Sequence, residues 1–139
     1  MGTDITPEIS RRNKYYISRH RYYELKHYCL QYPEWKRAYR ILNEKLESCS
    51  KSIANPTDAG VPHNTETMAL AMAAFAQNMK LVEDTAKRTD SLAGPYIFKA
   101  VTEGYSYPYF STVLKIPMSR DKYYEMYRRF FWLLDDVRT

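Results

Sequence analysis

Apolar residues at helical spacing run through most of the chain and predict an all-α protein. The clearest stretch is SRDKYYEMYRRFFWLLDD, residues 119–136. Its apolar positions recur at intervals of three and four, as they do on one face of an α-helix; they are Tyr123, Met126 or Tyr127, Phe130 and Leu134. Ser119 is a good N-cap because its hydroxyl can accept a backbone N–H at the start of the helix. The pattern predicts a terminal helix with one buried face.

Five further helices are predicted upstream, and no stretch predicts a β-strand. We expect them over residues 19–32, 34–49, 65–89, 95–103 and 107–114. Ser18 is the expected cap of the first helix. Pro33 is well placed to begin the second helix, and Gly104 is well placed to end the helix expected over residues 95–103. The first two helices should form a helical hairpin that is rich in aromatic side chains.

The composition of the chain divides it into three parts. Residues 1–49 are expected to form a basic arm and the N-terminal hairpin. Residues 50–64 hold two prolines, a glycine and small polar side chains, which is typical of a linker. Residues 65–139 are expected to hold a long central helix and a C-terminal helix-turn-helix. The alanine- and methionine-rich MALAMAAFAQNM is either a self-association or partner-docking face or an internal packing surface.

The net positive charge of the chain favours a polyanionic partner. The 139 residues are 45% apolar and 27% charged, with a net charge of +5 and a pI near 9.1. Residues 1–51 hold 11 Lys and Arg against 6 Asp and Glu, and residues 94–139 hold 7 against 5, whereas residues 52–93 hold 3 against 5. Basic charge at both ends is compatible with two surfaces that face DNA.

The remaining composition points to a cytoplasmic protein without catalysis. Cys29 and Cys49 fit free thiols in a reducing compartment, and no apolar run approaches a membrane span. No phosphate loop, nucleophile elbow or metal-protease motif is present. His20 and His27 share a helix face but lack the further ligands that a metal requires. We therefore expect no enzyme activity, no cofactor, no catalytic residue and no metal site.

The specific functional signal is a short helix, a tight connection and a basic helix. This order is the outline of a helix-turn-helix, in which the first residues of the second helix meet base edges. Four residues are expected to read DNA: Ser119, Arg120, Lys122 and Tyr124. Arg128 and Arg129 are expected to bind the phosphate backbone. The N-terminal arm, with Arg11, Arg12 and Lys14, either lies along phosphates or is an ordinary solvated terminus. The alternative is a helical hairpin whose charges are only solvated.

A family resemblance accompanies this outline. The run YIFKAVTEGYSYPYFSTVLKIPMSRDKYYEMYRRFFWLL resembles the C-terminal part of phage-encoded transcriptional regulators of the ArpU/RinA type, whose C-terminal region is similar to region 4 of sigma factors. YISRHRYYELKHYCLQYPEWK also resembles the N-terminal part of phage proteins found beside such regulators. The resemblance implies binding of double-stranded DNA near a late phage promoter, contact with host RNA polymerase and a location in the host bacterial cytoplasm.

Two alternative functions fit the same residues. One is a small phage protein that binds and inhibits a host protein, such as a defence nuclease or a polymerase, because tyrosine and tryptophan anchor protein interfaces. The other is a homo-oligomeric small subunit of a phage DNA-packaging terminase, which also joins a helix-turn-helix to an oligomerising helix.

Overall fold

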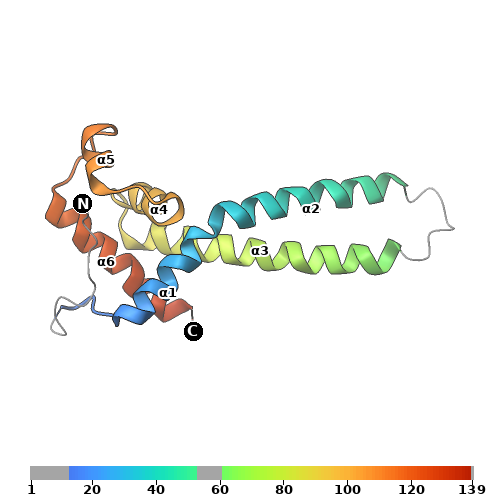
Figure 1. The fold of residues 1–139 in the computed structure, drawn as a ribbon, viewed down its shortest axis with the longest axis horizontal. Coiled ribbons are helices and arrows are strands. Elements are labelled where there is room, and N and C mark those ends of the chain that lie inside the picture. Colours follow the sequence, from blue (N-terminus) through green and yellow to red (C-terminus); the bar gives the residue numbers. More distant parts are fainter. Residues whose placement is uncertain (1–12, 53–60, 139) are drawn as a thin grey trace. The chain divides into compact units, whose positions relative to one another are not determined.

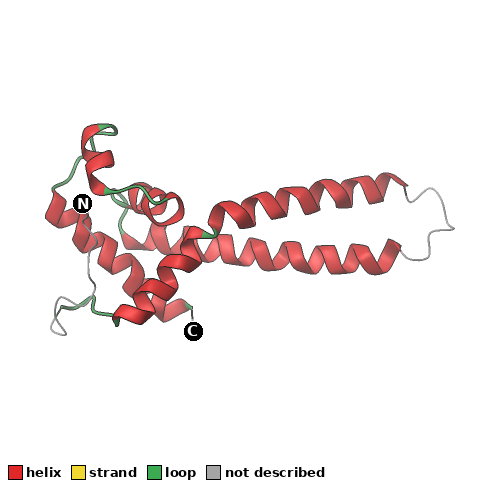
Figure 2. Ribbon diagram, in the orientation of Figure 1, coloured by secondary structure: helices red, strands yellow, loops and turns green. Residues whose placement is uncertain are grey.

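The computed structural model describes residues 13–52 and 61–138, and every regular element in these ranges is an α-helix (Figures 1 and 2). This confirms the all-α prediction. The six helices are α1 (Arg19–Leu30), α2 (Tyr32–Ser52), α3 (Val61–Thr89), α4 (Gly94–Glu103), α5 (Tyr107–Thr112) and α6 (Arg120–Val137).

The helices form two compact units. Unit 1 contains the described residues up to Gln31 and those from Leu81 onward, and unit 2 contains Tyr32–Lys80. The boundary therefore falls inside α3 and between α1 and α2. The described residues of unit 1 hold 13 Lys and Arg against 9 Asp and Glu, so they carry most of the net positive charge of the chain.

Local capping residues set the helix ends where the sequence predicts them. The Ser18 hydroxyl accepts the Arg21 backbone N–H at 3.3 Å, which caps the start of α1. Gly104 follows the last residue of α4 with φ of +81°, a left-handed conformation that glycine adopts without steric cost. The first helix ends two residues earlier than expected, because Pro33 cannot donate a backbone hydrogen bond and is accommodated in the first turn of α2.

The two helices of the predicted N-terminal hairpin fall in different units. In unit 1, α1 packs against α4 and α6, and α2 belongs to the other unit. The reason is the apolar face of α1, which is buried at Tyr22, Leu25 and Cys29. The Tyr22 ring meets the edge of Phe131 on α6, with ring centroids 5.0 Å apart. Within unit 1, α1 therefore shares a core with α4 and α6. The division at residues 49 and 65 stays a prediction.

The expected linker is also shorter than predicted. Residues 50–52 are the end of α2 and residues 61–64 are the start of α3, while residues 53–60 lie outside the described residues. Pro62 is the second residue of α3, where its missing N–H would have no helical acceptor. A proline that suggests a linker in the sequence can therefore begin a helix.

The core of unit 1 is built from the apolar faces of its helices. Each predicted apolar position of α6 is buried or half-buried, and the largest fully buried side chains include Tyr123, Phe130, Phe131, Leu25 and Ile97. The terminal helix thus buries its predicted face, as its spacing requires. Trp132 is the exception in the FFW triplet, with 41% of its surface exposed.

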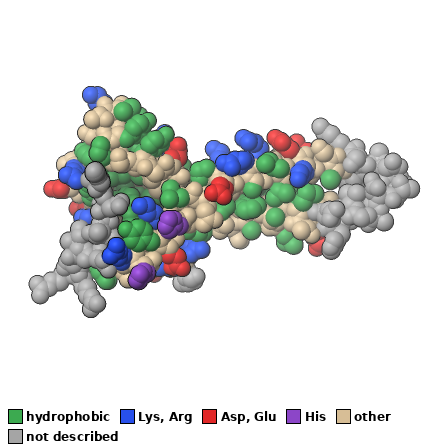
Figure 3. All heavy atoms as spheres, viewed as in Figure 1, with side chains coloured by type: hydrophobic (Ala, Val, Ile, Leu, Met, Phe, Trp, Pro, Cys, Tyr) green, Lys and Arg blue, Asp and Glu red, His purple; other side chains and the backbone are tan. Residues whose placement is uncertain are grey.

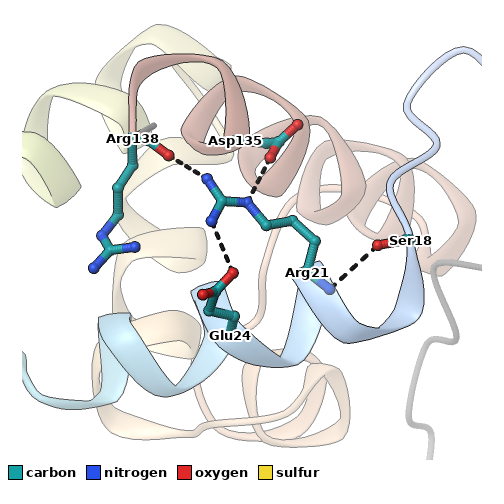
Figure 4. A network of polar contacts seen from close by, with 5 residues as sticks. All are labelled: Ser18, Arg21, Glu24, Asp135 and Arg138. Carbon is teal, nitrogen blue, oxygen red and sulfur yellow. Dashed lines mark hydrogen bonds and ion pairs between the residues drawn. The ribbon is translucent and has the colours of Figure 1, made fainter.

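A polar cluster ties the start of α1 to the end of α6 (Figure 4). Arg21 donates from Nε to Asp135 Oδ1 at 2.6 Å and from Nη1 to Glu24 Oε1 at 2.8 Å. Its Nη2 donates to the backbone oxygen of Arg138. The Arg138 guanidinium in turn lies 3.9 Å from the centroid of the Tyr28 ring. Apart from the contact with Glu24, these contacts join residues more than one hundred positions apart in the chain.

Candidate nucleic-acid interface

The candidate interface is the segment from α5 to the first turns of α6, all of it in unit 1. Helix α5 ends at Thr112, two residues before the expected end, so residues 113–119 connect it to α6. The connection is longer than the four residues predicted. Lys115 has φ of +53°, and this left-handed residue turns the chain so that the Ile116 N–H reaches the Phe110 oxygen at 2.9 Å. Ile116 is buried, and it anchors the connection to the core.

Aromatic packing holds the start of α6 against α5. Phe110 and Tyr123 are both fully buried, with ring centroids 5.8 Å apart. The Tyr107 ring lies 5.3 Å from that of Tyr123 and 6.1 Å from that of Tyr124. The Tyr107 hydroxyl also donates to the Met118 backbone oxygen at 3.1 Å, just before the helix begins. The backbone at the start of α6 is therefore held in place by the residues around it.

Two cations project from the first turn of α6. The Ser119 hydroxyl accepts the Lys122 backbone N–H at 3.2 Å, which confirms the predicted cap. Arg120 and Lys122 are exposed, whereas Tyr123 and Met126 of the same helix are buried. Such a placement leaves both side chains open to a ligand.

Tyr124 is half-buried and lies beneath one of these cations. The Arg120 guanidinium carbon is 5.4 Å from the centroid of the Tyr124 ring, a cation–π distance. Asp121, also in the first turn and exposed, meets the positive end of the helix dipole. The four residues predicted to read DNA thus gather at one end of α6.

The two arginines farther along α6 are placed differently. Arg129 donates from Nε to the Thr89 backbone oxygen at 2.9 Å and from Nη1 to the Tyr15 hydroxyl at 3.3 Å. Arg128 is half-buried, and its Nε is buried without a hydrogen-bond partner. The Arg129 guanidinium is hydrogen-bonded within the fold, and the Arg128 Nε is buried. The candidate interface therefore does not include these two residues.

The predicted N-terminal arm contributes one described residue. Arg11 and Arg12 lie outside the described residues. Lys14 is exposed, and its Nζ lies 5.0 Å from the centroid of the Tyr15 ring. Tyr15 is buried and also accepts the Arg129 hydrogen bond described above. Lys14 therefore lies next to a structural contact, apart from the group on α6.

The connection contains residues that sequence reasoning missed. Lys115 is exposed and adds a third cation close in sequence to Arg120 and Lys122. Val113 and Leu114 are also exposed, at 59% and 37%. The signal was present, because Lys115 is the only charged residue between Glu103 and Arg120. The expected helix extends to Leu114, which leaves only a short connection and gives Lys115 no role as an exposed loop residue.

The phenols beneath the interface are buried and uncharged at neutral pH. Burial raises the pKa of Tyr123 well above the usual tyrosine value, and the nearby Tyr124 and Tyr22 phenols act in the same direction. Burial also raises the pKa of Tyr127, whose hydroxyl lies 2.9 Å from that of Tyr22. A tyrosine with its ordinary pKa is already uncharged at neutral pH, and the raised pKa values keep these two phenols uncharged at higher pH as well.

Other kinds of site are not found in the described part of the chain. No group of three His, Cys, Asp or Glu side chains there could hold a metal ion. None of its helices is both long and apolar enough to cross a bilayer. The surface of α5 and α6 remains the strongest candidate.

Comparisons with protein-family models, with curated proteins and with solved structures gave no match.

Proposed function

We propose that the protein binds double-stranded DNA with the start of α6 and acts as a non-enzymatic transcriptional regulator of the phage type that its sequence resembles. The observation that carries the proposal is the outward placement of Arg120 and Lys122 on a capped helix start. A charge there can reach a phosphate or a base edge, whereas a charge in the core cannot.

The chemistry of the group fits a duplex. Arginine can donate two parallel hydrogen bonds to guanine O6 and N7, and lysine is a compact charge suited to phosphate. We assign base reading to Arg120 and phosphate contact to Lys122, with Lys115 as a second phosphate contact. Ser119 and Tyr124 serve as flanking contacts. The excess of basic residues in unit 1 adds attraction to DNA that does not depend on sequence.

The interface is of helix-turn-helix type in this proposal, with α5 as the first helix and α6 as the recognition helix. Three observations support this: the order of the two helices, the packing of aromatic side chains between them, and the exposed cations at the start of α6. The seven-residue connection is longer than the usual turn of this motif, and the exposed Lys115, Val113 and Leu114 enlarge the surface that meets the DNA.

The first test is a binding titration with duplexes selected from a random pool, carried out across a salt series. Arg120→Ala should weaken binding to the selected duplex by about 1–3 kcal/mol and relax its sequence preference. Lys122→Ala should weaken binding to every duplex and reduce the slope of log K against log salt by about one. These two signatures separate a base contact from a phosphate contact.

The control for this test is Lys36→Ala, which removes an exposed cation from α2 in the other unit. It should leave the affinity within about 0.5 kcal/mol of the wild type. Unchanged affinity of Arg120→Ala and Lys122→Ala for every duplex, with helix content intact, would rule out this interface.

A second candidate is binding of a host protein, and exposed aromatic and apolar side chains of unit 1 favour it. Trp132 is 41% exposed beside Tyr15, and Tyr105 is exposed and stacks on Tyr109 with ring centroids 4.4 Å apart. Aromatic side chains of this kind anchor protein interfaces. Salt-independent binding to a purified polymerase that Trp132→Ala abolishes, without any duplex binding, would select this function.

A further inference from the structure

One helix face in unit 2 lacks the charges that an exposed surface normally carries. The stretch 67–79 of α3 contains no Asp, Glu, Lys or Arg. Five of its exposed positions are Ala69, Leu70, Ala73, Ala74 and Gln77, and Leu70 has 67% of its surface exposed. A helix without a charged side is expected to be covered by another element.

The other helix of the same unit provides an internal comparison. The exposed positions of α2 are mostly charged; they include Glu34, Lys36, Arg37, Arg40, Glu44, Lys45 and Glu47. In Figure 3, the blue and red side chains of this region gather mainly along α2, and hydrophobic and other uncharged side chains cover much of the rest. The α2 surface is suited to water, and the difference singles out the exposed face of α3.

The spacing of this face matches the seam of a helix pair. Glu66, Leu70, Ala73, Gln77 and Lys80 are exposed and follow one another at intervals of four, three, four and three. This is the spacing at which one helix meets another in a coiled coil. The two ends of the seam carry opposite charges and are separated by about 21 Å at 1.5 Å per residue.

The charges decide which partner and which direction fit best. We infer that a second copy of this chain docks on the exposed face of α3, with the two helices antiparallel. Two-fold symmetry about Ala73 then places Glu66 of each copy opposite Lys80 of the other. A parallel pair would instead set glutamate against glutamate and lysine against lysine, which is unfavourable.

The side chains along the seam allow the two helices to approach closely. Ala73 lies at the two-fold axis, and the distance between packed helices depends on the size of the side chains at their contact. Leu70 of each copy then covers Ala74 and Gln77 of the other and becomes buried. The contact is about four helical turns long, so we expect a weak dimer with a dissociation constant on the order of micromolar or above.

The first experiment measures self-association of the full chain by sedimentation equilibrium, from low-micromolar to sub-millimolar concentration. The wild type should pass from monomer to dimer, and Leu70→Lys should remain a monomer. Leu92→Lys is the matched control, because it makes the same change at a leucine that is 51% exposed in unit 1. Circular dichroism checks that the helix content of each variant is unchanged.

Two outcomes of this experiment would overturn the inference. One is a wild type that stays monomeric at every concentration. The other is a dimer that Leu70→Lys leaves intact or that Leu92→Lys weakens equally.

The second experiment tests the direction of the pair by exchanging its end charges. Glu66→Lys and Lys80→Glu should each weaken the dimer about tenfold, since either change replaces two attractions by two repulsions. The double variant Glu66→Lys/Lys80→Glu should recover the wild-type constant to within about twofold at the same salt. A parallel pair predicts that the single variants dimerise as tightly as the wild type. Unweakened dimers in the single variants, or a double variant whose dimer stays weak, would therefore overturn the antiparallel arrangement.

Discussion

At the scale of single residues, the cations of unit 1 divide into those that hold the fold and those that are open to solvent. Arg21 makes three hydrogen bonds, to Asp135, Glu24 and the Arg138 backbone. These contacts raise the pKa of Arg21, chiefly through the hydrogen bond to Glu24 and then that to Asp135. The hydrogen bond from Arg21 correspondingly lowers the pKa of Glu24. Arg129 also makes hydrogen bonds within the fold, whereas Arg120 and Lys122 are exposed, so a count of charges overstates the cationic surface that is open to a ligand.

The ion pair between Arg21 and Asp135 should contribute measurably to stability. Asp135→Ala should lower the free energy of unfolding by about 0.5–1.5 kcal/mol, a range set by the partial exposure of both side chains. Urea denaturation checks this value. Asp136→Ala is the matched control, because it removes the neighbouring exposed carboxylate and should change stability by less than about 0.5 kcal/mol. Equal effects of the two changes would show that the contact with Arg21 does not stabilise the fold.

At the scale of the elements, close backbone approach fixes how α4 follows α3. Asp90 accepts the Leu92 and Ala93 backbone N–H groups through Oδ2, at 3.0 and 2.8 Å, and its own backbone oxygen accepts from Gly94. Gly94, the first residue of α4, is buried against the last turns of α3. A Cβ at this position would lie 2.9 Å from the Ala86 backbone oxygen. The glycine is therefore required by packing.

Gly94→Ala provides a test in which two effects have opposite signs. Helix propensity alone would make alanine more stable than glycine by up to about 1 kcal/mol. The close contact with the Ala86 backbone should dominate and destabilise the protein by about 1–3 kcal/mol. Thermal denaturation decides between the two, and an unchanged or raised Tm would mean that α3 and α4 are not packed as closely as described. Gly104→Ala is the comparison, because it meets no atom within 4 Å and acts only through its left-handed backbone.

At the scale of the whole molecule, unit 1 has an aromatic core in which several phenols are buried. Tyr22, Tyr123 and Tyr127 surround Phe131 or one another at ring distances of 5.0–6.4 Å. Burial raises the pKa of Tyr123 and of Tyr127, and it also raises the pKa of the buried Cys29 thiol. The folded protein thus holds protons on groups that the unfolded chain releases near its ordinary pKa values.

These shifts predict alkaline unfolding. A group whose pKa is higher in the folded than in the unfolded protein stabilises the fold fully at pH values below its unfolded pKa. This stabilisation is lost as the pH rises from the unfolded pKa to the folded pKa. The free energy of unfolding should therefore begin to fall above about pH 9, from the Cys29 thiol, and more steeply above about pH 10, from the phenols.

Tyr123→Phe removes one of these ionisations and tests the origin of the effect. The variant should lose stability with pH less steeply above pH 10, by up to about 1.4 kcal/mol for each pH unit. Denaturation at a series of pH values measures the slope. Tyr105→Phe, at an exposed tyrosine, should retain the wild-type slope. A slope that is the same in both variants would assign the alkaline effect to other groups.

Local features of the sequence predicted the individual helices more accurately than their arrangement. The caps at Ser18 and Ser119, the end of α4 at Gly104 and the buried face of α6 were all correct, because each depends on bonds between residues three or four apart. The predictions differ from the structure where segments that are distant in the sequence pack together. Buried Ile116 anchors a loop that begins two residues before the predicted end of the preceding helix, and Tyr22 packs on the C-terminal helix.

The sequence by itself determined that the described chain is helical, where most of its helices begin, and which face of α6 is apolar. Hydrogen bonding and hydrophobic spacing within a helix are local, so they can be read from neighbouring residues. Only the tertiary structure decided that α1 joins the C-terminal helices, that Arg21 and Arg129 are engaged in the fold, and that Arg120 and Lys122 are exposed. These outcomes depend on which apolar faces meet across the chain, and similar helical patterns are compatible with more than one such pairing.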